Sequence, residues 1–269
     1  MILCIDIGNT QTSCCFFNND SLEPVMDFYV PTFECLANNY LSQKLKTIWS
    51  NSDLINKVDK CIIASVVANA ENHWISAIKE IEKSLDSKIS IQILNAKTAE
   101  NLSKDIYDCI YPRPLEVGAD IIAASIAAKK IYGSPSCVID FGTATNINIV
   151  NEKGQFVSAV ISPGLQTSLN ALTNNADLLK KIKLKTPPSI INTTTEQTIQ
   201  AGIIYGEAAR ADGLIERIEE KLGAKTNIIA TGGWCQLIGP EMKRKPIINP
   251  YLVLQGLKIC VLQNMLSVV

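Results

Sequence analysis

Residues 2–10 read Ile2-Leu3-Cys4-Ile5-Asp6-Ile7-Gly8-Asn9-Thr10. Four apolar residues lead into an acid, a pattern that predicts a buried strand ending at a functional loop. Gly8 allows a sharp turn and leaves room for a ligand near the backbone. Asp6 lies at the carboxyl end of this strand, where open α/β sheets place their ligands, and its carboxylate suits hydrated Mg²⁺. The donors of Asn9 and Thr10 and the nearby backbone N–H groups suit the phosphate that accompanies the metal.

The same pattern returns in the second half of the chain as Cys137-Val138-Ile139-Asp140-Phe141-Gly142-Thr143-Ala144-Thr145. Asp140 follows Asp6 by 134 positions (140 − 6), which is about half of the 269 residues. Two such strand-loops predict two related α/β halves that face each other across a cleft, with both loops gripping one polyphosphate. The alternative is a pair of unrelated strand ends with ordinary turns.

The composition is that of a soluble globular protein, with 47% apolar and 19% charged residues. No apolar stretch reaches the length of a membrane span, and Asp6 interrupts an N-terminal apolar run that lacks a basic region, which argues against a signal peptide. A net charge of −1 gives no general attraction for nucleic acid. Nine cysteines without C-x-x-C spacing indicate reduced thiols in a cytoplasm. His73 is the single histidine, so a His-rich zinc site is excluded and we assign His73 no role.

Strand and helix patterns alternate along the chain, which predicts an α/β fold. Besides the strands before Asp6 and Asp140, we predict strands at residues 13–17, 22–30, 60–67, 89–94, 156–161 and 226–231. We predict helices at residues 33–49, 70–85, 118–133, 162–174, 195–222 and 250–266. Pro112 and Pro114 bar a helix, so we place the boundary between two domains, 1–114 and 115–269, at this point.

Three further features bear on function. Asp120 lies in the first turn of the helix predicted at 118–133, where an acid also complements the helix dipole without any catalytic role. The strand predicted at 226–231 ends in Gly232-Gly233, which suits a flat ligand such as adenine but also an ordinary tight turn. The glycines of the 195–222 helix permit close helix packing, including packing between subunits. The pattern G-x-x-x-x-G-K-[ST] is absent, so the chain is not a P-loop enzyme.

Eight motifs follow one another in order along the whole chain: residues 6–10, 111–114, 116–120, 140–145, 163–165, 195–202, 231–233 and 254–257. In order and spacing they resemble the type III pantothenate kinases, a branch of the acetate and sugar kinase, Hsc70 and actin superfamily. The resemblance implies two related actin-like (ribonuclease H-like) domains with mixed sheets flanked by helices and a cleft between them. It also implies a cytoplasmic homodimer that makes 4′-phosphopantothenate, the first committed step to coenzyme A.

The resemblance assigns roles to individual residues. Asp120 would be the general base, and Asp140 would hold a monovalent cation, K⁺ or NH₄⁺. ATP, its phosphates and Mg²⁺ would lie at Asp6, Gly8, Asn9, Thr10, Thr143, Gly232 and Gly233, with Asp6 serving the Mg²⁺. The pantothenate pocket would be formed by Tyr111, Gly118, Ala119, Asp120 and Ile121, with Thr195 reaching it from the second subunit.

Two departures from the family pattern leave the function open. Ile121 stands where the family has Arg in G-A-D-R, and it supplies neither the charge nor the donors of Arg. Asn148 stands where the family has Asp in T-T-x-D. Ala68 and Asn192 replace a usual Pro and a usual Gly, which are milder changes. The alternatives are a catalytically weakened paralogue with a binding or regulatory role, and a kinase of the same superfamily for another small hydroxylated acid or sugar.

Overall fold

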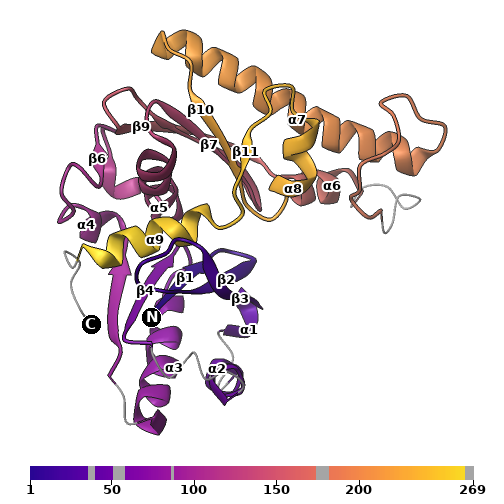
Figure 1. Ribbon diagram of the computed structural model, residues 1–269. Helices are drawn as coiled ribbons and strands as arrows, with labels where there is room; N and C mark the ends of the chain where they lie inside the picture. Colours follow the sequence, from indigo (N-terminus) through magenta and orange to yellow (C-terminus); the bar gives the residue numbers. More distant parts are fainter. Residues whose placement is uncertain (36–39, 51–57, 86–87, 174–181, 264–269) are drawn as a thin grey trace. The chain divides into compact units, whose positions relative to one another are not determined.

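The computed structural model describes residues 1–35, 40–50, 58–85, 88–173 and 182–263 (Figure 1). The chain forms two compact units. The first contains Met1–Asp108, Pro112–Ala127 and Leu252–Val269, and the second contains Cys109–Tyr111 and Ala128–Tyr251. Among the described residues, no helix is long and apolar enough to cross a membrane.

The first unit is built on a five-stranded mixed sheet in the order β3-β2-β1-β4-β5. Its strands are β1 (Ile2–Ile7), β2 (Gln11–Phe17), β3 (Pro24–Pro31), β4 (Lys60–Ser65) and β5 (Ser90–Leu94). The first three strands are antiparallel neighbours, whereas β4 runs parallel to both β1 and β5. The central strand β1 is buried on both faces, which explains why its sequence is apolar without alternation.

Helices cover both faces of this sheet. On one face Leu3, Ile5 and Ile7 form a core with Trp74 and other residues of α2 (Tyr40–Ser50) and α3 (Ala70–Leu85). On the other face α9 (Leu252–Leu262) packs against β1, β2 and β4, and the Lys258 ammonium lies 5.7 Å from the centre of the Phe17 ring. Shorter helices are α1 (Thr32–Cys35), α4 (Ala96–Ala99) and the 3-10 turn η2 (Pro114–Glu116).

Helix α9 also packs closely against α5 (Ala119–Ala127). Gly256 makes this approach possible, because a Cβ at this position would lie 1.9 Å from the Ala123 carbonyl oxygen. Helix α9 also holds the turn between β2 and β3 through two hydrogen bonds. The Gln255 side-chain amide donates to the Leu22 carbonyl oxygen at 3.1 Å, and the buried Lys258 ammonium donates to the Ser21 carbonyl oxygen.

Five strands of the second unit repeat the strand order of the first, and a sixth strand is added at one edge. Its sheet has the order β11-β10-β7-β8-β9-β6, with strands β6 (Asp108–Cys109), β7 (Ser136–Phe141), β8 (Ala144–Val150), β9 (Gln155–Pro163), β10 (Asn227–Thr231) and β11 (Ile247–Ile248). As in the first unit, the central strand β7 has an antiparallel neighbour, β8, and a parallel one, β10. Strand β7 occupies the positions of β1 shifted by 134 residues (136 − 2 and 141 − 7). The predicted relation between the two halves is therefore confirmed at the level of topology.

The long helix α7 (Thr195–Leu222) packs on one face of the second sheet. Its buried residues Ile204, Ala208, Ala211 and Ile215 form a core with Cys137 and Ile139 of β7. The Thr194 hydroxyl accepts the Gln197 N–H at its start, and Gly223, with φ of 71°, ends it. The other helical segments are η3 (Ala128–Tyr132), α6 (Leu165–Thr173), α8 (Cys235–Ile238) and η5 (Gly239–Glu241).

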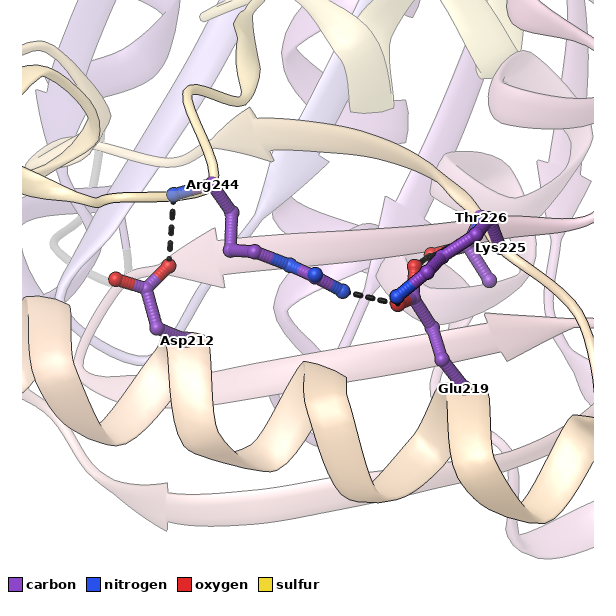
Figure 2. Close-up of polar contacts among 5 residues, drawn as sticks. All are labelled: Asp212, Glu219, Lys225, Thr226 and Arg244. Atoms are coloured by element: carbon purple, nitrogen blue, oxygen red, sulfur yellow. Dashed lines mark hydrogen bonds and ion pairs between the residues drawn. The ribbon is translucent and has the colours of Figure 1, made fainter.

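Two acids of α7 hold the segment that precedes β11 (Figure 2). Asp212 accepts the backbone N–H groups of Lys243 and Arg244 at 2.8 Å and 3.2 Å. Glu219, which is buried, accepts hydrogen bonds from the side chains of Arg244 and Lys225 and from Thr226. Burial by itself would raise the pKa of the Glu219 carboxyl, but the bonds from Lys225, Thr226 and Arg244 outweigh it and lower this pKa to about 2.

The predicted α/β class with two mixed sheets is confirmed, and most predicted elements are present. The boundary predicted after Pro114 differs from the observed division. Helices α5 and α9 belong with the first unit because they pack on its sheet and on each other. The helix predicted at 33–49 is formed as α1 and α2, and its residues 36–39 lie outside the described part, as do residue 174 and residues 264–266 of two other predicted helices.

Candidate active site

The first candidate loop follows β1, and hydrogen bonds from Thr32 hold it in place. The Gly8 N–H donates to the Gln11 carbonyl oxygen at 3.1 Å, and a Cβ on Gly8 would lie 2.9 Å from that oxygen. The Thr32 hydroxyl donates to the Gly8 carbonyl oxygen at 2.7 Å, and the Thr32 N–H donates to the Thr10 carbonyl oxygen at 3.0 Å. These bonds fix the turn while Asn9 and Thr10 remain exposed and Asp6 is partly buried. A fixed, exposed turn of this kind can receive phosphate oxygens.

Within the first unit, the start of α5 lies beside the end of β1. Val66 connects the two, because its N–H donates to the Ile7 carbonyl oxygen at 3.1 Å and its Cγ1 would lie 3.7 Å from a Cβ on Gly118. A Cβ on Gly118 would also meet the Asp120 carboxylate at 2.5 Å. Glycine at 118 therefore leaves the space that the Asp120 side chain uses, and Asp6 and Asp120 belong to neighbouring elements at one end of one sheet.

Asp120 is a partly buried acid with few donors. Burial raises the pKa of its carboxyl above the usual value, and backbone N–H bonds, including the one from Ile121 at 2.8 Å, oppose this rise. The N–H groups at the start of the helix lower the pKa of the Asp120 carboxyl, but burial has the larger effect. A raised pKa makes a carboxylate a stronger base, which is what proton abstraction from a hydroxyl requires.

Ala119 and Ile121 flank Asp120 differently. Ala119 is buried in the helix packing, whereas Ile121 is partly exposed and supplies only its backbone N–H to Asp120. The position where the family has Arg is thus a surface of the helix start and not a core position. An apolar side chain at 121 removes a positive charge and its donors from beside Asp120 and adds nothing to the hydrophobic core.

The second candidate loop begins at Asp140, whose neighbours in the sheet are polar. Thr231 of β10 and Asn146 of β8 are its direct register partners, and paired residues project from the same face. The Thr231 hydroxyl and the Asn146 and Asn148 side-chain carbonyl oxygens are buried, and none has a hydrogen-bond partner in the described part of the chain. Buried oxygens without donors indicate a place for a bound group. Asn148 itself is 1% exposed and sits one pleat deeper in the sheet than Asn146.

Gly232 brings the end of β10 against this loop. It has φ of +86°, and a Cβ there would meet the Asp140 carboxylate at 2.2 Å and the Phe141 backbone at 2.8 Å. Gly233 is exposed with open space around it. Thr143 is also exposed, while its carbonyl oxygen accepts bonds from the Thr167 hydroxyl at 2.8 Å and the Gly164 N–H at 3.2 Å. The loop is therefore held through its backbone.

The remaining predicted site residues also lie in the second unit. The Tyr111 ring packs edge-on against Phe156, with ring centres 6.2 Å apart. Thr195 is the exposed first residue of α7. The first unit thus brings together Asp6, Gly8, Asn9, Thr10, Gly118, Ala119, Asp120 and Ile121, and the second holds Tyr111, Asp140, Thr143, Thr195, Gly232 and Gly233. The cleft between the Asp6 and Asp140 loops stays a prediction.

Sequence reasoning missed Thr231 and Asn146 as neighbours of Asp140. Their signal lies in the strand pairing, because each occupies the place beside Asp140 on an adjacent strand. Across the described residues, no group of three or more His, Cys, Asp or Glu side chains is placed to hold a metal ion. Mg²⁺ sites of nucleotide-dependent enzymes need only one or two carboxylates, because substrate phosphates supply further ligands.

The fold and the paired acidic loops define a class. Solved structures of the same fold include a putative Baf family transcriptional activator from Campylobacter jejuni, with a TM-score of 0.55 and 16% identity over 97% of this chain and 98% of that one. A putative N-acetylmannosamine kinase from Listeria monocytogenes has a TM-score of 0.50 and 12% identity over 98% and 99% of the two chains. The protein therefore has the α/β fold of the actin-like sugar kinases.

Within this class the sequence is more specific. The family described as type III pantothenate kinase matches residues 2–217. The type III pantothenate kinase of Halalkalibacterium halodurans is 32% identical over 265 residues, covering 98% of this chain and 100% of the relative. That of Frankia alni is 31% identical over 264 residues, covering 98% and 100%. The chain belongs to the type III pantothenate kinase family.

Proposed function

We propose that the protein transfers the γ-phosphoryl group of ATP to the primary hydroxyl of pantothenate, with Asp120 as general base. The product is 4′-phosphopantothenate, and the reaction is the first step of coenzyme A biosynthesis. The observation that carries the proposal is the Asp120 site in a member of this family. A partly buried acid with a raised pKa lies beside Gly118, at the end of the sheet that carries the Asp6 loop.

The Asp6 loop receives the ATP phosphates. The fixed turn at Gly8, the exposed Asn9 and Thr10, and the Asp6 carboxylate fit a metal-bound polyphosphate. Mg²⁺, when bound, neutralises charge on the phosphates during transfer. Asp6 would hold the Mg²⁺ ion, and one carboxylate is sufficient for this because the substrate phosphates supply further ligands. Asp120 accepts the proton of the attacking hydroxyl and orients that hydroxyl toward the phosphate.

The Asp140 loop holds a monovalent cation, K⁺ or NH₄⁺, and contributes Thr143 and Gly232–Gly233 to the nucleotide site. The residues fit such an ion, because the buried oxygens of Thr231 and Asn146 flank Asp140 and are the hard ligands that it requires. A bound cation would offset the negative charge of the Asp140 carboxylate next to an anionic nucleotide.

The protein works as a homodimer through the exposed face of α7. Gly202 and Gly206 lie on this face, and nothing comes within 4 Å of the Cβ each lacks. Such a face allows another helix to approach closely. In the dimer, Thr195 at the start of α7 reaches the pantothenate site of the second subunit, and Tyr111 contributes to the same pocket.

A second candidate function is phosphorylation of a different small hydroxylated acid or sugar. The observation that favours it is Ile121, a partly exposed apolar side chain beside Asp120 where the family has Arg. An Arg there would offer a fixed positive charge to the carboxylate of pantothenate, and Ile offers none.

An ADP-release assay with Mg²⁺ and K⁺ separates the two candidates, with pantothenate compared against a panel of small alcohols. We expect pantothenate to give the highest kcat/KM, and Ile121→Arg to lower the KM for pantothenate more than it changes kcat. If another acceptor is preferred and Ile121→Arg abolishes activity, the pocket serves a different substrate. If no acceptor is turned over although ATP binds, a catalytically weakened paralogue is the better description.

A further inference from the structure

The buried acid Glu207 lies in the middle of α7 and contacts Thr145, at the end of the second candidate loop (residues 140–145). The residue is 7% exposed, yet it carries a carboxylate into the packing between helix and sheet. The Thr145 hydroxyl donates to one carboxylate oxygen at 2.6 Å. The Arg210 guanidinium, one turn along the helix, pairs with the other oxygen. Burying a charge is expensive unless it is paired and hydrogen-bonded, and both conditions are met here.

The contacts of Glu207 and Arg210 reach both segments that shape the loop. Thr145 immediately follows Thr143 and Ala144, so its hydroxyl fixes the carboxyl side of the loop to α7. Arg210 also donates to the Pro163 carbonyl oxygen at 2.8 Å. Pro163 precedes Gly164, whose missing Cβ would lie 2.4 Å from the Gly142 carbonyl oxygen and 2.6 Å from that of Thr143. Glu207 and Arg210 therefore hold the 142–145 loop and the Pro163–Gly164 segment that packs against it.

The rest of the loop is supported in a complementary way. The Ser162 hydroxyl donates to the Thr145 carbonyl oxygen at 3.2 Å, and the Thr167 hydroxyl donates to that of Thr143 at 2.8 Å. These bonds come from β9 and α6 and hold backbone atoms. Glu207 is placed differently, because it is a charged group on a separate helix that holds the side chain of Thr145.

From this geometry we infer that Glu207, with Arg210, is a positioning residue for nucleotide binding, setting the conformation of the 142–145 loop through Thr145. The inference rests on the proposed role of this loop in binding ATP. Glu207 touches no reacting atom in this role. Its effect falls on the affinity for ATP, because the proposed base Asp120 lies on α5 in the first unit and Thr195, the α7 residue proposed for the pantothenate pocket, lies 12 positions (207 − 195) before Glu207.

The test compares Glu207→Gln, which keeps the shape and removes the charge, with Thr145→Val, which removes the hydroxyl, and Thr145→Ser, which retains it. Glu216→Gln, an exposed acid on the same helix, is the matched control. The readouts are the KM for ATP, the KM for pantothenate, and the Kd for ATP measured by calorimetry. A charge-assisted hydrogen bond changes an equilibrium by roughly tenfold or more.

We expect Glu207→Gln and Thr145→Val each to raise the KM and Kd for ATP by about tenfold, with the KM for pantothenate unchanged. The double variant should be little worse than either single variant, because both remove one interaction. Thr145→Ser and Glu216→Gln should bind ATP like the unmodified protein. A loss of thermal stability with unchanged ATP affinity would overturn the inference, and so would equal changes in both KM values.

Thr143→Ala separates failure of this inference from failure of the proposed function. If Thr143→Ala weakens ATP binding and neither Glu207→Gln nor Thr145→Val does, the loop binds nucleotide and the positioning role is wrong. If none of the three variants alters the Kd for ATP, the loop does not bind nucleotide, and the inference about Glu207 is wrong as well. If pantothenate is not phosphorylated, the calorimetric Kd for ATP still decides the inference.

Discussion

The two units place an aspartate at the same point of the same strand pattern, but they surround it with different neighbours. Asp6 on β1 is paired with Ala64 and Ser13, whereas Asp140 on β7 is paired with Thr231 and Asn146. Ala64 has no oxygen in its side chain and Ser13 has one hydroxyl, while both neighbours of Asp140 present buried oxygens without hydrogen-bond partners in the described chain. The repeat thus keeps the strand pattern and changes the side chains beside the acid, which supports the proposal of Mg²⁺ at one loop and a monovalent cation at the other.

The sharpest test of this comparison is the loss of each carboxylate. We expect Asp6→Asn to abolish turnover, because no register partner of Asp6 supplies a second acid to hold Mg²⁺. Asp140→Asn, its counterpart, should retain measurable activity because Thr231 and Asn146 remain. The ADP-release assay measures both, with circular dichroism to check folding. Equal losses in the two variants would contradict the distinction between the loops.

The next largest effect concerns Asp120, which belongs to the first unit and has no part in the repeat. We expect Asp120→Asn to lower turnover by about 10²–10⁴-fold, the usual contribution of general-base catalysis, with ATP affinity unchanged. Because the pKa of Asp120 is raised, the acid limb of the pH–rate profile should lie above the range of an ordinary aspartate. Full turnover in the variant would leave Asp120 as a helix-start acid only.

The same variant also has a stability signature. Burial raises the folded-state pKa of Asp120, so its favourable contribution exists below the unfolded pKa and is lost as pH rises through the folded pKa. At neutral pH the ionised carboxylate therefore opposes folding, and Asp120→Asn should melt at a higher temperature than the unmodified protein. A lower melting temperature at neutral pH would show that the carboxylate is held by structural contacts.

A smaller effect is expected at the neighbours of Asp140. Thr231→Val keeps the size of the side chain and removes its oxygen, so the K⁺ concentration for half-maximal activity should rise by roughly tenfold. Ser13→Ala, at the place in the first unit that corresponds to Asn146, is the matched control and should leave the K⁺ response unchanged. The measurement is a K⁺ titration of turnover at fixed Mg²⁺. An identical K⁺ response in Thr231→Val would remove Thr231 from the cation site.

The smallest effect on turnover is expected at Glu219, an acid whose pKa is lowered, whereas that of Asp120 is raised. Its donors lower its pKa to about 2, so its stabilisation is present above the unfolded pKa and is lost as pH falls from about 4.5 to about 2. Glu219→Gln should reduce the free energy of unfolding at neutral pH by about 1–3 kcal/mol and flatten the acid limb of stability, with normal turnover. Urea titrations between pH 2 and pH 7 measure this; an unchanged acid limb would refute it.

The sequence was sufficient for the features that are local. The apolar runs before Asp6 and Asp140, their separation and the Gly that follows each acid predicted both strands and their relation. It was not sufficient where the cause lies between distant residues. Nothing near Gly256 in the sequence indicates that the Ala123 carbonyl oxygen occupies the place of its Cβ, so the sequence alone predicts α5 and α9 in the second half although both belong to the first unit. The bond from Thr145 to Glu207 joins residues 62 positions apart, and the two-residue strands β6 and β11 are too short to leave a pattern.

The close packing of α9 on α5 and on the first sheet also bears on how the chain is synthesised. The first unit needs Leu252–Leu262 to cover its sheet, whereas all of the second unit precedes Leu252. During translation, the unit whose strands leave the ribosome first is therefore the one that finishes folding last. The Ile2–Phe17 hairpin must wait, with one apolar face uncovered, while the whole second unit is made.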